Sequence, residues 1–133
     1  MGPTTATKCP DHQRLDFLPR HAAGQFLIYE QTVYAYMYKA CSVYRGGVWD
    51  YYSLSNGGFF MAWDVTGSVP MEWPDNFYDG EMSARAASIA VNLMVQGHLC
   101  ASRDAERFIR SYRALSRYAA EHDESGEIFR FID

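Results

Sequence analysis

The spacing of apolar residues along the chain predicts helices towards both ends. Apolar positions recur every three or four residues from about 19 to 41, and Pro19 suits the first turn of a helix. The segment from about 84 to 96 is apolar on most sides, which is typical of a buried helix, and Ser83 is placed to cap its start. A further helix is predicted from Arg103 to Glu121, with one apolar side.

Strands are predicted between these helices. Aromatic-rich runs from about 48 to 54 and from 59 to 63 flank Asn56-Gly57-Gly58. Asn-Gly supplies the positive φ angles of a type I′ turn, so the two runs should form an antiparallel hairpin. A third run, from about 69 to 73, carries Pro70, which lacks a backbone donor and belongs at a sheet edge. The pattern predicts an α+β fold with an N-terminal helix, a three-stranded antiparallel meander and a C-terminal helical half.

The domain organisation follows from length and composition. Residues 1–16 are polar and aperiodic, so we expect a poorly ordered leader followed by a single domain over residues 17–133. The chain is 48% hydrophobic but has no apolar run long enough to cross a membrane, and it has no secretory leader. Its three widely spaced cysteines are typical of free thiols in a reducing compartment. We therefore expect a cytoplasmic protein without membrane contact.

The charge balance bears on one class of function. Twelve basic and sixteen acidic residues give a net charge of −4. A protein that imitates DNA needs dense carboxylates in place of regularly spaced phosphates. Here the acidic residues are scattered, and only Asp123 and Glu124 are adjacent. The sequence therefore argues against DNA mimicry.

The predicted helix over residues 103–121 has a basic side opposite its apolar side. At about 100° per residue, five arginines fall within one third of its circumference: Arg103, Arg107, Arg110, Arg113 and Arg117. This arginine stripe can bind phosphates or an acidic groove of a protein. Alternatively, it is a solvated surface with ion pairs such as Glu106 with Arg110. Because the overall charge is acidic, we expect only weak, non-specific binding to nucleic acid.

Few residues have a setting typical of catalysis. Asp79 and Glu81 flank Gly80 at the end of a predicted loop over residues 74–80, where two carboxylates can serve acid–base or metal chemistry. Alternatively, they belong to a capping turn before the next helix. No second Cys/His pair has zinc-ligand spacing, and there is no glycine-rich phosphate loop. We therefore expect no catalytic residue, metal, cofactor or small-molecule substrate.

The aromatic hairpin is a candidate for protein binding. Successive side chains of its first strand point to opposite sides, and both sides are partly apolar. One side can pack on helices while the other forms an exposed aromatic patch built from Trp49, Tyr51, Phe59 and Trp63, or from their opposite neighbours. Complete burial is the alternative. The candidate partner contacts in the hairpin and the segment after it are Trp49, Asp50, Tyr51, Asn56, Asp79 and Glu81.

Several separated motifs resemble those of the ArdB/KlcA antirestriction family, in the family's order. They are Phe17-Leu18-Pro19, Tyr44-Arg45-Gly46-Gly47, the hairpin sequence GGVWDYYSLSNGGFFMAW over residues 46–63, NFYDGEMSA over residues 76–84, and the endings Ala120-Glu121-His122 and EIFRFID over residues 127–133. The resemblance covers roughly residues 14–133. It departs from the expected pattern at Trp63, which stands where a proline is expected after the second strand of the hairpin.

The resemblance implies a function. It points to an inhibitor of host type I restriction endonucleases, carried by a plasmid or other mobile element and acting without catalysis. Its implied partner is the type I restriction complex or the DNA-bound state of that complex, contacted directly or indirectly. Two alternatives from the residues stay open: a small DNA-binding accessory module that uses the stripe from Arg103 to Arg117, and a hydrolase that uses Asp79 and Glu81.

Overall fold

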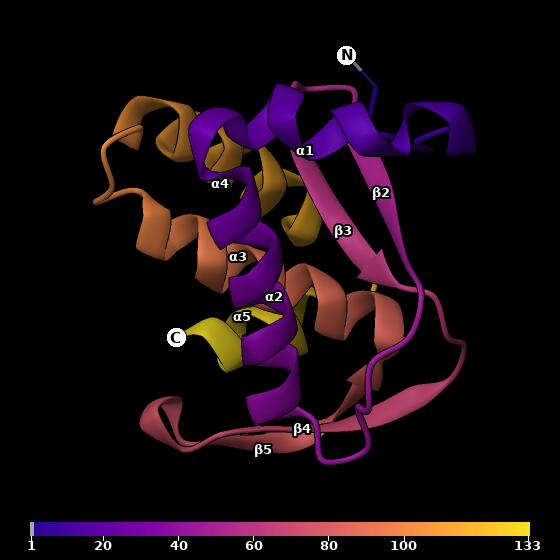
Figure 1. The fold of residues 1–133 in the computed structure, drawn as a ribbon. Coiled ribbons are helices and arrows are strands. Elements are labelled where there is room, and N and C mark those ends of the chain that lie inside the picture. Colours follow the sequence, from indigo (N-terminus) through magenta and orange to yellow (C-terminus); the bar gives the residue numbers. More distant parts are fainter. Residues whose placement is uncertain (1) are drawn as a thin grey trace.

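Helix α3 (Ala84–Leu99) lies at the centre of the fold in the computed structural model, which describes residues 2–133 (Figure 1). Eleven of its residues are buried, as its apolar sequence predicts. Around it lie helices α1 (Arg14–Ala22), α2 (Phe26–Ala40), α4 (Ala105–Ala120) and α5 (Ser125–Ile132), and strands β1 (Ala6–Lys8), β2 (Trp49–Leu54), β3 (Phe59–Trp63), β4 (Ser68–Trp73) and β5 (Tyr78–Ser83).

The strands form two antiparallel sheets. One has the order β1-β2-β3, and the other is the hairpin β4-β5. The predicted α+β class is confirmed: an N-terminal helical region, a three-stranded antiparallel sheet and helices in the C-terminal half. The third strand of the sheet is nevertheless not the predicted one, because β1 occupies that place and β4 pairs with β5.

Polar side chains of α3 explain why β4 does not join the larger sheet. Ser88, Asn92 and Gln96 follow one another at helical spacing, and all three are fully buried along the open edge of β3. The Ser88 hydroxyl accepts from the Trp63 N–H (3.0 Å), and the Gln96 amide donates to the Phe59 carbonyl (3.0 Å). These bonds take the place of a neighbouring strand on that edge.

Asn92 lies in the middle of this row and makes the most bonds. Its side-chain oxygen accepts from the Met61 N–H (3.0 Å), and its amide donates to the Met61 carbonyl (2.7 Å). The same oxygen also accepts a hydrogen bond from the hydroxyl of Tyr29 on α2. One side chain therefore joins the sheet edge to two helices.

The hairpin β2-β3 has the predicted strands but a different turn. Its register runs from Trp49 opposite Trp63 to Ser53 opposite Phe59. Only Gly57 in the turn has a positive φ (93°), whereas a type I′ turn needs two such residues. The Gly57 N–H donates to the Leu54 carbonyl (3.0 Å), which is the pattern of a three-residue loop closed by a left-handed glycine.

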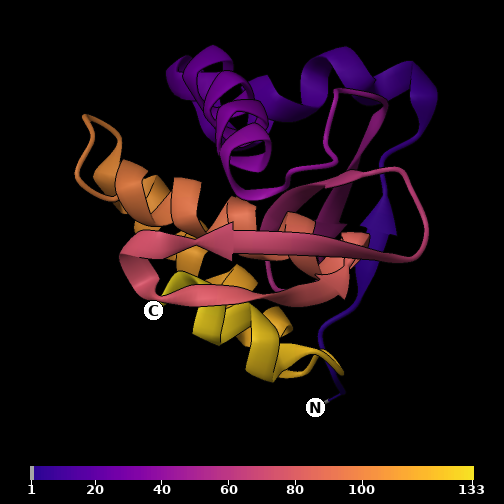
Figure 2. The same cartoon turned by 90° about the horizontal axis from the view of Figure 1, so that it is seen from below.

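The predicted loop over residues 74–80 is mostly structured. The hairpin β4-β5 turns through the 3-10 segment η3 (Pro74–Asn76) and through Phe77, and it lies along the bottom of the molecule in Figure 1 and faces the viewer in Figure 2. Pro70 lies opposite Glu81 in this ribbon. Because both strands of a two-stranded ribbon are edges, Pro70 is at a sheet edge as predicted.

The N-terminal helical region differs from the prediction in the number of helices and in the position of Pro19. The single helix expected over residues 19–41 is two helices, interrupted at η2 (Ala23–Gln25), where Ala23 has a φ of 48°. Pro19 accordingly lies inside α1 rather than in a first turn.

Residues 2–16, expected to belong to a poorly ordered leader, take part in the fold, while Met1 lies outside the described residues. Strand β1 pairs with β2, placing Ala6 opposite Leu54. The Cys9 N–H donates to the Tyr51 carbonyl (2.7 Å), and α1 begins at Arg14. The segment is too short and too polar to show strand periodicity, so its order depends on β2.

None of the described helices combines the length and the apolar character needed to span a bilayer.

Candidate functional site

Three elements that are distant in sequence form a basic surface. It consists of Arg20 at the end of α1 and of Arg107, Arg110, Arg113 and Arg117 on α4, grouped around the β2-β3 turn. Two adjoining cavities of about 230 and 260 Å³ open on it. Residues lining the first cavity are Arg20, His21, Asn56, Gly57, Phe59, Arg107, Arg110 and Ser111. Residues lining the second are Asn56, Arg110, Arg113, Ala114 and Arg117.

The β2-β3 turn is fixed to α4 by Asn56 and Gly58. The Asn56 amide donates to the Ala114 carbonyl (2.9 Å), and its side-chain oxygen accepts from the Gly58 N–H (3.1 Å). A Cβ atom at Gly58 would lie only 2.8 Å from the Cβ of Ala114. Asparagine and glycine therefore hold the turn close enough to α4 for both to line the same cavities.

Most of the charge on this surface is not neutralised within the protein. Arg107 binds Asp104 (2.9 Å). In residues 2–133, the other four arginines of the surface have no carboxylate within ion-pair distance, and the Glu106–Arg110 pair considered above does not form. Arg103, the fifth member of the predicted stripe, precedes α4 and lines neither cavity. These arginines remain available to an anionic partner.

The pKa of His21, which lines the first cavity, is lowered by its surroundings. Its ring lies 4.5 Å from that of Phe17 and 4.9 Å from that of Phe59, between ring centroids. Burial lowers the pKa of His21 to about 4, and the positive charges of Arg20 and Arg107 add to this effect. The imidazole is therefore neutral at pH 7, so the positive charge around this cavity comes from its arginines.

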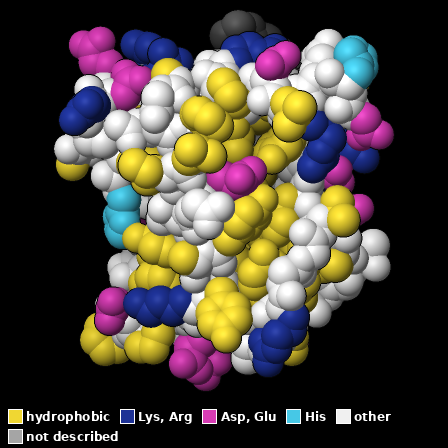
Figure 3. Space-filling view, viewed as in Figure 1, with side chains coloured by type: hydrophobic (Ala, Val, Ile, Leu, Met, Phe, Trp, Pro, Cys, Tyr) yellow, Lys and Arg dark blue, Asp and Glu magenta, His cyan; other side chains and the backbone are white. Residues whose placement is uncertain are grey.

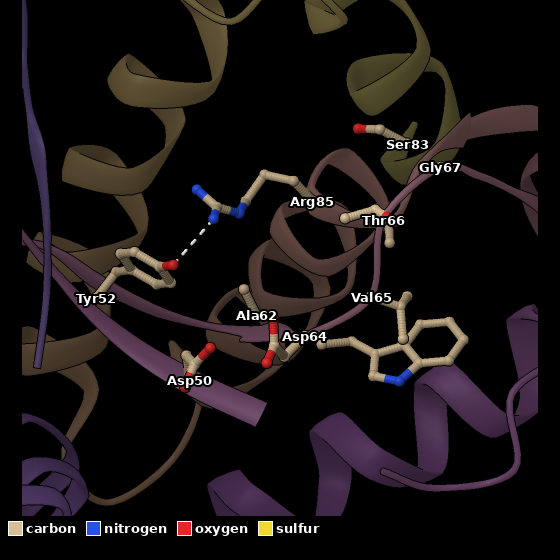
Figure 4. Close-up of a pocket in the computed structure, with 11 residues that line it drawn as sticks. Asp50, Tyr52, Ala62, Asp64, Val65, Thr66, Gly67, Ser83 and Arg85 are labelled. Atoms are coloured by element: carbon tan, nitrogen blue, oxygen red, sulfur yellow. Dashed lines mark hydrogen bonds between the residues drawn. The ribbon is translucent and has the colours of Figure 1, made fainter. Parts of the chain in front are cut away.

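A third cavity, of about 320 Å³, lies beside the start of α3 (Figure 4). Four of its polar residues, Asp50, Tyr52, Ser83 and Arg85, have partners within the protein. Arg85 donates to the Tyr52 hydroxyl (2.9 Å), and the Asp50 carboxylate lies 3.3 Å from the Arg14 guanidinium and 3.6 Å from the Lys8 amine. The Ser83 hydroxyl accepts from the Ala86 N–H (3.0 Å), which is the N-cap predicted for α3. These four side chains therefore stabilise the walls of the cavity.

The candidate contacts on β2 are not on the surface. Trp49, Asp50 and Tyr51 are only 3%, 7% and 8% exposed, so these residues form no exposed patch and the burial alternative holds for them. Phe59 and Trp63 are buried as well. The Tyr51 ring stacks on Phe17, and its hydroxyl donates to Glu30 (3.0 Å). Burial raises the pKa of Tyr51 to about 12, with a further contribution from Glu30.

The remaining candidate contacts are exposed but lie on different parts of the molecule. Asn56 is part of the β2-β3 turn, whereas Asp79 and Glu81 point outwards from β5. No His, Ser or Cys donates a hydrogen bond to either carboxylate in the described part of the chain. No group of three potential metal ligands is found among residues 2–133. The described structure therefore shows no arrangement of side chains around Asp79 and Glu81 that supports the hydrolase alternative.

Figure 3 shows hydrophobic side chains gathered over the middle of one face of the molecule, and α2 carries several exposed apolar residues. Leu27, Ile28 and Tyr38 are 60%, 55% and 66% exposed. Burial on the other side of α2, at Tyr29, Val33 and Met37, agrees with the predicted apolar periodicity. The apolar periodicity did not predict which apolar residues of α2 would be exposed, because this helix is apolar around most of its circumference.

Comparison with known proteins gives consistent results. A family model described as "Antirestriction protein" matches residues 42–133. Antirestriction protein KlcA of Escherichia coli is 38% identical over 139 residues, which cover 99% of this chain and 95% of KlcA. The uncharacterized protein YafX of E. coli strain K12 is 38% identical over 133 residues, covering 97% of this chain and 88% of YafX.

A solved structure has the same fold. It belongs to work on KlcA and ArdB proteins described as showing a novel fold and antirestriction activity against type I DNA restriction systems in vivo but not in vitro. The match has a TM-score of 0.90 at 40% sequence identity, and it covers 99% of this chain and 96% of that chain.

Proposed function

The chain belongs to the antirestriction protein family, and on that premise we propose that it inhibits a type I restriction endonuclease in the host cell. One observation carries the proposal. Nearly the whole chain aligns with a solved structure of proteins that are active against type I systems in vivo, at a TM-score of 0.90. In this proposal the gene belongs to a plasmid or other mobile element, whose DNA enters a new host without that host's methylation.

Inhibition proceeds without DNA mimicry in this proposal. A DNA mimic presents an array of carboxylates at phosphate-like spacing. The four exposed carboxylates on and beside the β4-β5 turn are too few for such an array, whereas arginines from α1 and α4 cluster around two cavities. A surface of this sign repels the DNA-binding groove of a restriction complex and attracts DNA itself or an acidic protein surface.

No chemical step is assigned to the protein. The two exposed carboxylates of β5 lack a catalytic partner in the described residues, and Arg85 and Asp50 in the cavity of Figure 4 are paired within the protein. We therefore assign the effect to binding. The target is the type I complex or its DNA-bound state, and the basic surface is the contact for phosphates.

The basic surface also favours a second candidate function, a small DNA-binding accessory module. Arg20 extends the surface beyond α4, so more phosphates can be contacted than a single helix would allow. Sub-micromolar duplex binding at physiological salt that is abolished when Arg107, Arg110 and Arg113 are replaced by Ala would favour this alternative.

Phage plating tests the main proposal. Unmodified phage is plated on two otherwise identical strains, with and without a type I system, each with and without this protein. We expect a higher plating efficiency only in the restricting strain, while methylation by the system continues. Equal plating with and without the protein would contradict the proposal. Protection in cells that is absent with purified components would indicate a further host factor.

A further inference from the structure

Phe77, in the turn of the β4-β5 hairpin, has an unusual combination of exposure and backbone conformation. Its side chain is 96% exposed, the highest value among the exposed large hydrophobic residues of the described chain. Its φ and ψ are 55° and 33°, in the left-handed region that glycine and asparagine adopt at much lower cost. A bulky residue at such a position is an outlier that calls for a role.

The base of this turn is held firmly. The Asn76 amide donates to the Phe131 carbonyl at the end of α5 (2.8 Å), and the Phe77 N–H donates to the Pro74 carbonyl (3.0 Å). On either side of the turn, Trp73 and Tyr78 are buried against the Phe131 ring, at centroid distances of 5.7 and 5.5 Å. Phe77 is therefore an exposed aromatic ring on a rigid support, so little conformational entropy is lost when it binds.

The surroundings of Phe77 are acidic. Exposed carboxylates on or beside the turn are Glu72, Asp75, Asp79 and Glu81. Of the nearby cations, Lys39 lies over the Trp73 ring and Arg130 is paired with Glu127. This excess of negative charge repels phosphates, whether of DNA or of an anionic membrane. It is complementary to a protein surface that carries lysine or arginine.

We propose that Phe77 is the anchor of a protein-docking site, and that its ring enters an apolar pocket rimmed by basic residues on a protein partner. This rests on the proposed function, in which the partner is the restriction complex or a host protein that acts with it. A single aromatic residue can dominate such an interface when it fills a pocket that excludes water. The flanking carboxylates orient the contact and accelerate its formation.

Two substitutions separate this role from a role in folding. Phe77→Gly and Phe77→Asn both suit left-handed backbone, so the purified variants should melt at the same temperature as the wild type or higher. Loss of an anchor residue weakens an interface by roughly 30-fold or more. Both variants should therefore lose phage protection at matched expression. The matched control is Leu15→Ala, which removes an apolar side chain that is 93% exposed on α1 and should leave protection intact.

The possible results distinguish failure of the docking role from failure of the proposed function. Protection by the wild type together with equal protection by Phe77→Gly would overturn the docking role alone. A lower melting temperature of Phe77→Gly would place Phe77 in the fold instead and would also overturn it. Absence of protection by the wild type would overturn the proposed function and the docking role together.

The charge of the partner is tested separately. Asp75→Lys keeps Phe77 but reverses a neighbouring charge, so protection should fall while the melting temperature is unchanged. Unchanged protection would contradict a basic-rimmed pocket.

Binding to a membrane is tested with vesicles. We expect that the wild type does not co-sediment with phosphatidylethanolamine–phosphatidylglycerol vesicles. Sedimentation that Phe77→Gly abolishes would assign Phe77 to a membrane and overturn the proposal.

Discussion

At the scale of single residues, two neighbouring glycines of the β2-β3 turn serve different purposes. Gly57 needs its positive φ of 93°, although a Cβ there would meet nothing within 4 Å. Gly58 needs the space, because α4 lies against it. The sequence Asn56-Gly57-Gly58 predicted a tight turn, but not which glycine would meet another helix, since that contact joins residues far apart in the chain.

Gly57→Val should destabilise the protein. A β-branched residue in left-handed backbone costs about 1–2 kcal/mol or more, and it favours a shift in the register of β2 and β3. Gly57→Asn is the control, since asparagine tolerates this conformation. We expect thermal unfolding to show a clear drop for valine and a small one for asparagine. Equal melting temperatures for the wild type and the valine variant would contradict the positive φ.

His21 should make stability depend on pH. Its pKa in the folded protein is lowered to about 4, whereas an unfolded histidine has a pKa near 6.5. The unfolded state therefore binds more protons between these two values, so the stability that is present above pH 6.5 falls as the pH decreases towards 4. Urea unfolding of the wild type and of His21→Gln at several pH values checks this. The variant should show a shallower fall, and parallel profiles would contradict the expectation.

At the scale of elements, the local signals were sufficient for the hairpin and the C-terminal helices. Strands expected at 48–54 and 59–63 are Trp49–Leu54 and Phe59–Trp63, and the helices expected at 84–96 and 103–121 are Ala84–Leu99 and Ala105–Ala120. The apolar periodicity of these elements and the Ser83 cap of α3 are local in the sequence. The partner of β4 is nearby, but the sequence of β5 contains Asp79, Gly80 and Glu81, which are unfavourable in strands and indicate a loop instead. Strand β1 carries no local signal, because its partner β2 is distant in the sequence.

The polar row on α3 illustrates this limit. A helix with Ser88, Asn92 and Gln96 among apolar residues predicts burial, but its sequence does not reveal that these side chains bind the edge of β3. Once β3 is covered in this way, β4 must pair elsewhere. The predicted meander wrongly included residues 69–73 as its third strand, because the sequence does not show that three side chains of α3 cover the edge of β3.

Asn92→Leu should be strongly destabilising. The change leaves the Met61 N–H and carbonyl without their partners in a buried setting, and each unsatisfied group costs roughly 1–3 kcal/mol. The control Gln31→Leu makes a comparable change at an exposed position of α2. We expect the urea midpoint to fall steeply for Asn92→Leu only. A midpoint close to that of the control would mean that the α3 row contributes little.

At the scale of the whole molecule, charge is divided between two regions. The basic surface lies with α1 and the β2-β3 turn, at the top of Figure 1, while the acidic turn that carries Phe77 belongs to the β4-β5 hairpin at the bottom. Helical spacing identified the arginines of α4. Arg20, His21 and Phe77 were not identified as site residues, although Phe77 lies within the motif over residues 76–84, because their surroundings depend on the fold.

This separation predicts that the two regions can be disabled independently. Replacing Arg110, Arg113 and Arg117 by Gln removes three exposed charges without removing an ion pair of the described structure, so stability should be retained. Each phosphate that the variant no longer neutralises should reduce the slope of log affinity against log salt by about 0.9. Glu106→Gln, on the same side of α4, should strengthen duplex binding instead.

Duplex binding measured at several salt concentrations, together with phage plating, decides whether the basic surface binds phosphates in the cell. The triple variant should lose both binding and protection, whereas Phe77→Gly should bind DNA like the wild type and yet fail to protect. This pattern would place phosphate binding and protein docking on different regions of the molecule, both needed in the cell. A triple variant that binds DNA weakly but protects fully would remove the basic surface from the mechanism and leave the Phe77 turn as the binding region that remains.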